Sequence, residues 1–301
     1  IPRILKEREP AMDKQLKLKI SIIALAILTQ IPYMLPSITS SLPKINQMLN
    51  QPIYGWAALS SCLLWFIVKY RPIINALEAN RSLIASHKHL TAGLTVSTAA
   101  LITELLSPKA DVFYAAALSL LFISGVFIVL GSLTPVMISI AYIAGIGTPE
   151  IINAIAYKAL SESAAATMAW TLNILGYTAY AQGASIRIQT VNGGFINAYI
   201  DPVCAGSTSL SVFICLFTLI TMDLNPKPRW KIAAFLIAGC VGTMAQAMLR
   251  LTLMGVIGAN HGLEAFLTAH NYLGYLLFAI YFTLFTYAYL RSTAKMDGGG
   301  S

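Results

Sequence analysis

Charged side chains are scarce in this sequence. Only 11% of its 301 residues are Asp, Glu, Lys or Arg, whereas 57% are hydrophobic. A soluble domain of ordinary composition carries about 25% charged residues, so this composition argues against a soluble globular protein. The net charge of +8 does not predict nucleic-acid binding, because the basic residues cluster in loops between apolar runs, a pattern that orients membrane proteins.

Cysteine is also scarce, and its spacing fits no common ligand pattern. The chain has four cysteines, with no CxxC pair and no Cys/His pair at metal-ligand spacing. We therefore expect no disulfide framework, no metal and no cofactor. Cys62, Cys215 and Cys240 lie inside apolar runs, where a cysteine is usually a small core residue. Cys204 differs, because it lies in a polar, turn-rich segment just before an apolar run.

Apolar runs near 20 residues recur along the chain, and this is the length that a helix needs to cross a bilayer core of about 30 Å. Eight such runs cover approximately residues 20–36, 52–69, 90–106, 112–131, 133–148, 205–222, 230–258 and 271–290. The sequence therefore predicts an all-α polytopic membrane protein. A basic N-terminus, residues 1–19, precedes a single integral-membrane catalytic domain, residues 20–291, and the tail 292–301 ends in a Gly-Gly-Gly-Ser linker.

Residues 149–203 form the longest stretch without a predicted span. Pro149 and Glu150 are helix-start signals, and apolar residues recur after them at helical spacing. Further on, Asn-Gly-Gly at 192–194 separates two β-prone runs, which is a strong β-hairpin signal. We therefore expect a small cap, made of a helix and a hairpin, on one side of the membrane.

Eight spans place both termini on the same side of the membrane. With the termini in the cytoplasm, most basic residues are cytoplasmic, as the positive-inside rule requires. The basic residues left on the other side are Lys44, Lys109, Lys158, Arg187 and Arg250. We therefore predict a multi-pass protein of the cell membrane whose cap faces the extracytoplasmic side.

Counting along the spans also places three reactive side chains at the same depth, on the extracytoplasmic face. Cys204 precedes the sixth run, and Arg250 lies about 30 Å of helix beyond Trp230. His270 ends a predicted polar loop, Ala259–His270, directly before the eighth run. Such a trio suits nucleophilic catalysis: nearby positive charge lowers the pKa of a thiol, an imidazole moves protons, and a guanidinium stabilises an oxyanion.

Each of these residues has a simpler interpretation. Arg250 could extend to lipid head groups, and His270 could be an ordinary interface residue. His261 is a rival base in the same predicted loop. Ser207 and Ser209 are rival nucleophiles, but no GxSG motif surrounds them, and Ser207 is better suited to cap the sixth helix.

Three short motifs occur in order on this face. They are Cys-Ala-Gly-Ser at 204–207, Gln-Ala-Met-Leu-Arg-Leu at 246–251 and His-Asn-Tyr-Leu-Gly at 270–274. They resemble the C-[SA]-G-x, N-x-x-R and H-x-x-x-G elements of the exosortase/archaeosortase family, and the resemblance covers roughly residues 130–290. Ala247 stands where that family usually has Asn, with Gln246 beside it.

The resemblance implies a cysteine transpeptidase in which Cys204 is the nucleophile, His270 the base and acid, and Arg250 the oxyanion or substrate-docking group. The implied partners are secreted proteins whose C-terminus carries a recognition motif, a transmembrane helix and a basic tail, with a membrane lipid as a possible acceptor. We favour the archaeosortase branch, because no hydrolase-like domain is fused to the C-terminus. Candidate substrate contacts are Asp201, Ser207 and Gln246.

Two other functions fit parts of the sequence. A multi-span transporter would need charged groups at the centres of its spans, whereas Arg250 and Glu104 lie near predicted outer ends. A lipid-linked acyltransferase could use the same thiol, and the acyl group carried by Cys204 would distinguish it from a transpeptidase.

Overall fold

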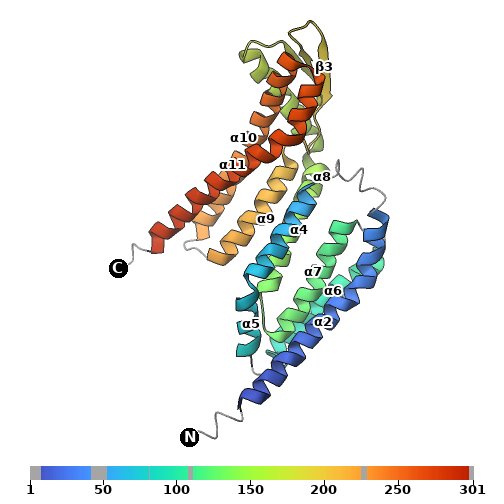
Figure 1. The fold of residues 1–301 in the computed structure, drawn as a ribbon, viewed down its shortest axis with the longest axis vertical. Helices are drawn as coiled ribbons and strands as arrows, with labels where there is room; N and C mark the ends of the chain where they lie inside the picture. The colour runs from blue at the N-terminus through green and yellow to red at the C-terminus, as the bar shows by residue number, and fades with distance from the viewer. Residues whose placement is uncertain (1–7, 42–52, 81, 108–110, 225–228, 298–301) are drawn as a thin grey trace. The chain divides into compact units, whose positions relative to one another are not determined.

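The computed structural model describes residues 8–41, 53–80, 82–107, 111–224 and 229–297 (Figure 1). These residues are mainly helical. The helices are α2 (Arg8–Ser41), α4 (Ile53–Val68), α5 (Tyr70–Ala79), α6 (His87–Leu106), α7 (Val112–Leu130), α8 (Thr134–Ile174), α9 (Ser207–Leu224), α10 (Arg229–His261) and α11 (Leu263–Asp297). The strands are β1 (Ala179–Gln182), β2 (Ser185–Gln189) and β3 (Phe195–Tyr199).

The described residues contain seven helices that are long and apolar enough to cross a membrane. An eighth span arises if α4 and α5 are counted together, since these two helices form a broken pair bent by 54°. This result confirms the predicted all-α polytopic membrane protein. The chain divides into two compact units, Ile1–Ile146 and Gly147–Ser301.

The first unit is held together by helix packing and by side chains that satisfy backbone carbonyls. The buried Lys19 of α2 donates to the carbonyls of Leu77 and Asn80 at 2.8 and 2.6 Å, at the end of α5. A cation suits this position because the carbonyls at a helix C-terminus carry partial negative charge. Between α6 and α7, the Ser97 hydroxyl donates to the carbonyl of Phe122 at 3.0 Å. None of the predicted catalytic residues lies in this unit.

In the second unit, α10 packs against both α9 and α11. An aromatic cluster joins these helices, with Phe213 of α9 stacked on Phe217 at 5.6 Å and edge-on to Phe285 of α11 at 5.1 Å. Gly239 of α10 faces the ring of Phe213 so closely that a β-carbon there would overlap it. This packing sets how α9, α10 and α11 lie against one another, and these helices carry or adjoin all three predicted catalytic residues.

The cap contains a three-stranded antiparallel sheet in the order β1-β2-β3. The predicted hairpin is confirmed as β2 and β3, but β1 was not predicted, because four residues reading Ala-Tyr-Ala-Gln give little alternation. One face of the sheet is buried: Ile186, Ile188 and Ile196 are at most 3% exposed. They share a core with residues of α8, α10 and α11. The cap is therefore anchored on the helices that surround Cys204.

Two predicted boundaries were wrong. The fifth span and the cap helix are one continuous helix, α8, with Pro149 in its interior. A proline signals a helix start only where the preceding residues are not already helical, and here they are. The predicted polar loop 259–270 is instead helical except for Gly262, whose positive φ of 87° allows a one-residue break between α10 and α11. The polar side chains of this stretch are misleading because they lie on the exposed sides of α10 and α11.

Candidate active site

Cys204 lies in a tight turn, residues 201–206, which joins β3 to α9. The Cys204 amide donates to the Asp201 carboxylate at 2.7 Å. The Ala205 amide donates to the Asp201 carbonyl at 2.9 Å. Such local bonds from an aspartate fix a turn without help from other elements. Asp201, predicted as a substrate contact, therefore holds the backbone that positions the thiol.

Gly206 closes this turn against α10. Its φ of 111° lies in the left-handed region, which disfavours residues with a β-carbon. A β-carbon at Gly206 would also lie 2.6 Å from the Cβ of Ala247. The small side chain of Ala247, which is 1% exposed, thus lets the turn sit directly on α10.

Arg250 of α10 contacts the same turn. Its Nη2 donates to the backbone carbonyl of Cys204 at 2.6 Å. On its other side lies Gly274 of α11, where an added β-carbon would be 2.8 Å from Nη1. The guanidinium is therefore held between the Cys204 turn and α11. The simpler interpretation, in which this side chain extends to lipid head groups, does not describe its position.

His270 lies on α11 one helical turn before Gly274, so the two residues share a face of the helix. Its side chain is exposed. The charges of Arg250 and Asp201 both act on the His270 imidazole and on the Cys204 thiol. The structure therefore brings the three predicted catalytic residues together around the turn. No hydrogen bond joins Cys204 to His270 among the described residues, and catalytic hydrogen bonds often tighten only when substrate binds.

Burial raises the pKa of the Cys204 thiol to about 12. This value of about 12 already includes the negative charge of Asp201, which adds to the effect of burial, and the positive charge of Arg250, which opposes it. The sequence predicted that nearby positive charge would lower the pKa. Arg250 has that effect, but burial and Asp201 outweigh it. The resting thiol is thus protonated at neutral pH and needs a base at the moment of attack.

Several buried polar atoms at the start of α9 and in α10 have no hydrogen-bond partner among the described residues. They are Ser207 Oγ, Gln246 Oε1 and Arg250 Nε. Ser207 is 0% exposed and Gln246 8%. A buried polar atom without a partner costs about 1–3 kcal/mol, so these atoms suit contacts that form when a substrate fills the site.

The rival residues are less well placed. His261 is the last residue of α10 and is exposed. It lies eleven residues beyond Arg250 in α10, or about 16 Å of helix. Ser207 is buried at the start of α9, but its Oγ has no hydrogen-bond partner among the described residues, so it does not cap this helix as predicted. Ser209 is half-buried on α9, two residues beyond Ser207.

One contact near the site was not predicted. The hydroxyl of Tyr157 on α8 lies 3.4 Å from the hydroxyl of Tyr199 at the end of β3. Asp201 acts electrostatically on Tyr157, which links this tyrosine pair to the Cys204 turn. No spacing rule could have joined the pair, because 42 residues separate its members.

Comparison with known protein families matches this chain to the transmembrane exosortases over residues 50–287. The chain belongs to the transmembrane exosortase family. The match begins at residue 50, about 80 residues before the range 130–290 over which the sequence motifs suggested a resemblance, and it ends close to the end of that range. Searches among curated proteins and among solved structures gave no match to this exosortase.

Family membership implies a transpeptidase role in protein sorting for this multi-pass membrane protein. The match is to the exosortases as a whole, so the archaeosortase branch stays a prediction. The orientation of the termini and the face on which the site opens also stay predictions, and so do the roles of Cys204, Arg250 and His270.

Proposed function

We propose that this exosortase is a cysteine transpeptidase that cleaves the C-terminal sorting signals of secreted proteins at the extracytoplasmic face. In this proposal Cys204 carries the secreted protein as a thioester and passes it to a lipid or another surface acceptor. The observation that carries the proposal is the hydrogen bond from Arg250 to the carbonyl of Cys204. It fixes a permanent cation beside the only one of the four cysteines that lies in a turn.

The first half-reaction forms the thioester. His270 takes the thiol proton as Cys204 Sγ attacks the carbonyl carbon of the scissile peptide, a step needed because the pKa of the resting thiol is about 12. The carbonyl oxygen becomes an oxyanion, and the Arg250 guanidinium stabilises it. The C–N bond then breaks, and the departing amine takes the proton from His270. The released C-terminal fragment keeps its transmembrane helix and basic tail.

The second half-reaction resolves the thioester. An amine or hydroxyl of the acceptor, or water, gives its proton to His270 and attacks the thioester carbonyl. The C–S bond breaks, and Cys204 recovers the proton. Ser207 Oγ and Gln246 Oε1 have no hydrogen-bond partner within the part of the chain that the structure describes, and we assign them hydrogen bonds to the substrate backbone or to the acceptor.

The test compares secreted proteins from cells that produce the wild-type chain, Cys204→Ala or Cys240→Ala. Cys240 is a half-buried thiol on α10, and Cys240→Ala serves as the matched control. Mass spectrometry of C-terminal peptides should find a set of proteins that keep their C-terminal segment only in the Cys204→Ala cells. Unchanged C-termini in those cells would exclude the proposal.

The mass of the trapped intermediate separates the proposal from its alternative. Rapid acid quenching of the wild-type enzyme with a substrate segment from that set should leave a peptidyl adduct on Cys204. A fatty acyl adduct at this residue would instead identify a lipid-linked acyltransferase.

A further inference from the structure

The strand that leads into the Cys204 turn has an unpaired edge. β3 is paired with β2 alone, and the sheet ends with it. In the register between them, Asn197 lies opposite Arg187, and Tyr199 lies opposite Ser185. No described residue forms a hydrogen bond to the other edge of β3.

Hydrogen bonds at both ends of β3 show which backbone groups face that edge. The Ile200 amide donates to the Ala184 carbonyl at 2.8 Å, and the Thr190 amide donates to the Gly194 carbonyl at 2.9 Å. Antiparallel pairs alternate between bonded and non-bonded positions. The amide and carbonyl of Asn197 and Tyr199 therefore point away from β2, where they are available to another strand.

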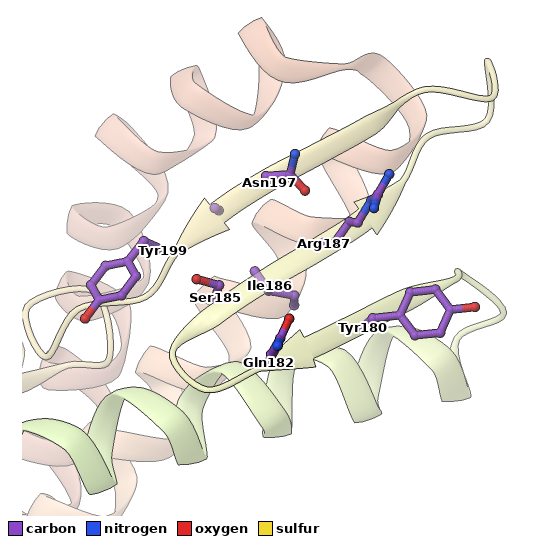
Figure 2. Close-up of a pocket in the computed structure, with 8 residues that line it drawn as sticks. Tyr180, Gln182, Ser185, Ile186, Arg187, Asn197 and Tyr199 are labelled. Carbon is purple, nitrogen blue, oxygen red and sulfur yellow. The ribbon is translucent and has the colours of Figure 1, made fainter.

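The side chains of the same residues line a pocket on the open face of the sheet (Figure 2). The pocket has a volume of about 610 Å³, within the range of about 300–1,000 Å³ typical of ligand sites. Tyr180, Arg187 and Asn197 form one row across the three strands. Arg187 lies 3.9 Å from the centre of the Phe195 ring. This face offers aromatic surface and hydrogen-bonding groups, which suit the side chains of an extended peptide.

The free edge of β3 runs toward Cys204, the nucleophile of the proposed reaction. β3 ends at Tyr199, the Cys204 turn follows at once, and α9 then begins at Ser207. The proposed substrate has the same order: a polar segment outside, the scissile bond, then a transmembrane helix. A substrate lying alongside β3 and α9 in the same direction would place its scissile bond beside Cys204.

We propose that β3 is the docking strand for the substrate, whose extended segment before the scissile bond pairs in parallel with the free edge of β3. This inference rests on the proposed function and deepens it. Addition of a peptide strand to a sheet edge is a general recognition mode, in which backbone bonds give affinity and neighbouring pockets give specificity. Asn197 and Tyr199 supply the backbone bonds, and the pocket receives alternate side chains of the peptide.

The first test contrasts two substitutions at one position. Asn197→Pro removes the outward amide and leaves the ladder with β2 intact, because proline is tolerated on the free side of an edge strand. Asn197→Ala removes the side chain and keeps the amide. The probe is a peptide with the C-terminal segment of a secreted protein whose processing depends on Cys204. We expect kcat/KM to fall at least about tenfold for Asn197→Pro, mainly through KM, and less than about threefold for Asn197→Ala. Equal effects of the two substitutions would contradict the proposal that the substrate docks on β3.

Two further measurements keep this test decisive. The rate of Cys204 alkylation by iodoacetamide, measured without substrate, should be unchanged in both variants if they fold normally. Residue-resolved hydrogen exchange on Cys204→Ala, with and without the probe, needs no substitution in β3. Binding should protect the amides of Asn197 and Tyr199, whereas bound probe without this protection would overturn the inference. If the C-terminal processing of no secreted protein depends on Cys204, the proposed function itself is wrong. The mass spectrometry of secreted proteins gives that result before any variant of β3 is made.

Discussion

Asp201 acts on Cys204 in two ways. Its carboxylate accepts the Cys204 amide and so fixes the turn, while its negative charge raises the pKa of the thiol. The enzyme therefore holds its proposed nucleophile in place and also keeps it protonated. A protonated thiol reacts slowly with oxidants and stray electrophiles, and this protects the proposed nucleophile until a substrate binds.

The pKa of Cys204 leads to a prediction about its reactivity. With a pKa of about 12, the thiolate fraction, and with it the alkylation rate by iodoacetamide, should rise about tenfold for each pH unit between 7 and 10. Asp201→Asn removes a negative charge that raises the pKa but keeps an oxygen for the Cys204 amide. We expect faster alkylation of Asp201→Asn at pH 8, measured by mass spectrometry. Slower alkylation would contradict the role given to the Asp201 charge.

A second prediction at the level of single residues concerns Gly274. Gly274→Ala would place a β-carbon 2.8 Å from Arg250 Nη1 and would displace the guanidinium. Since a misplacement of about 1 Å can cost about 100-fold in rate, we expect kcat for processing of the probe peptide to fall about 10- to 100-fold. Gly147→Ala is the matched control, because a β-carbon there meets nothing within 4 Å. Full activity of Gly274→Ala would contradict a catalytic role that depends on the position of the Arg250 guanidinium.

At the scale of elements, the relative position of α9 and α10 depends on close packing. Gly239 of α10 leaves room for the Phe213 ring of α9, and the Tyr281 hydroxyl donates to the Gly239 carbonyl at 2.7 Å. The start of α9 adjoins the Cys204 turn, and α10 carries Arg250. This contact therefore supports the geometry of the site from within the membrane-spanning part of the unit.

Gly239→Ala tests this support. The added methyl group overlaps the Phe213 ring, and overpacking of this kind costs about 1–3 kcal/mol. We expect a lower midpoint of thermal unfolding in detergent, measured by intrinsic fluorescence. The double variant Gly239→Ala, Phe213→Leu should recover part of the loss. A midpoint equal to that of the wild type would mean that the helices can move apart at little cost.

Most elements were predictable because their signals are local. Long apolar runs, the basic segments between them and the Asn-Gly-Gly turn at 192–194 act within a few residues. The misplaced boundaries, at Pro149 in α8 and at the start of α11, depend on the environment. Membrane helices tolerate an interior proline, and a polar stretch can continue a helix when its apolar side is buried, as Phe266 is. β1 exists because it pairs with β2, not because of its own sequence.

The lateral arrangement of the site could not be predicted from the sequence, and the common depth of its three residues in the membrane stays a prediction. Counting along the spans brought Cys204, Arg250 and His270 to one level. It could not show that Arg250 bonds the Cys204 carbonyl or that Gly274 lies against the guanidinium, because these contacts depend on how α10 and α11 pack. The effect of burial on the Cys204 pKa was inaccessible for the same reason.

At the scale of the whole molecule, the family match places the chain among membrane proteins, and its orientation is a prediction. We expect Asn192→Cys, in the turn between β2 and β3, to react with a membrane-impermeant maleimide in intact cells. Ser82→Cys, in the exposed segment between α5 and α6, should react only after permeabilisation. The readout is a gel shift of the labelled protein, and the reverse pattern would invert the assigned topology.

The continuity of α8 constrains any exchange of parts between relatives. Its 41 residues begin in the first compact unit and end at Ile174, just before β1. A chimera joined near residue 149 would therefore cut through this helix in mid-course. Joints placed after Gly176, where the chain turns with a positive φ of 87°, and before Asp201 would transplant the sheet and leave both the long helix and the cysteine turn intact. If β3 docks the substrate as proposed, such a graft should carry substrate preference from one exosortase to another.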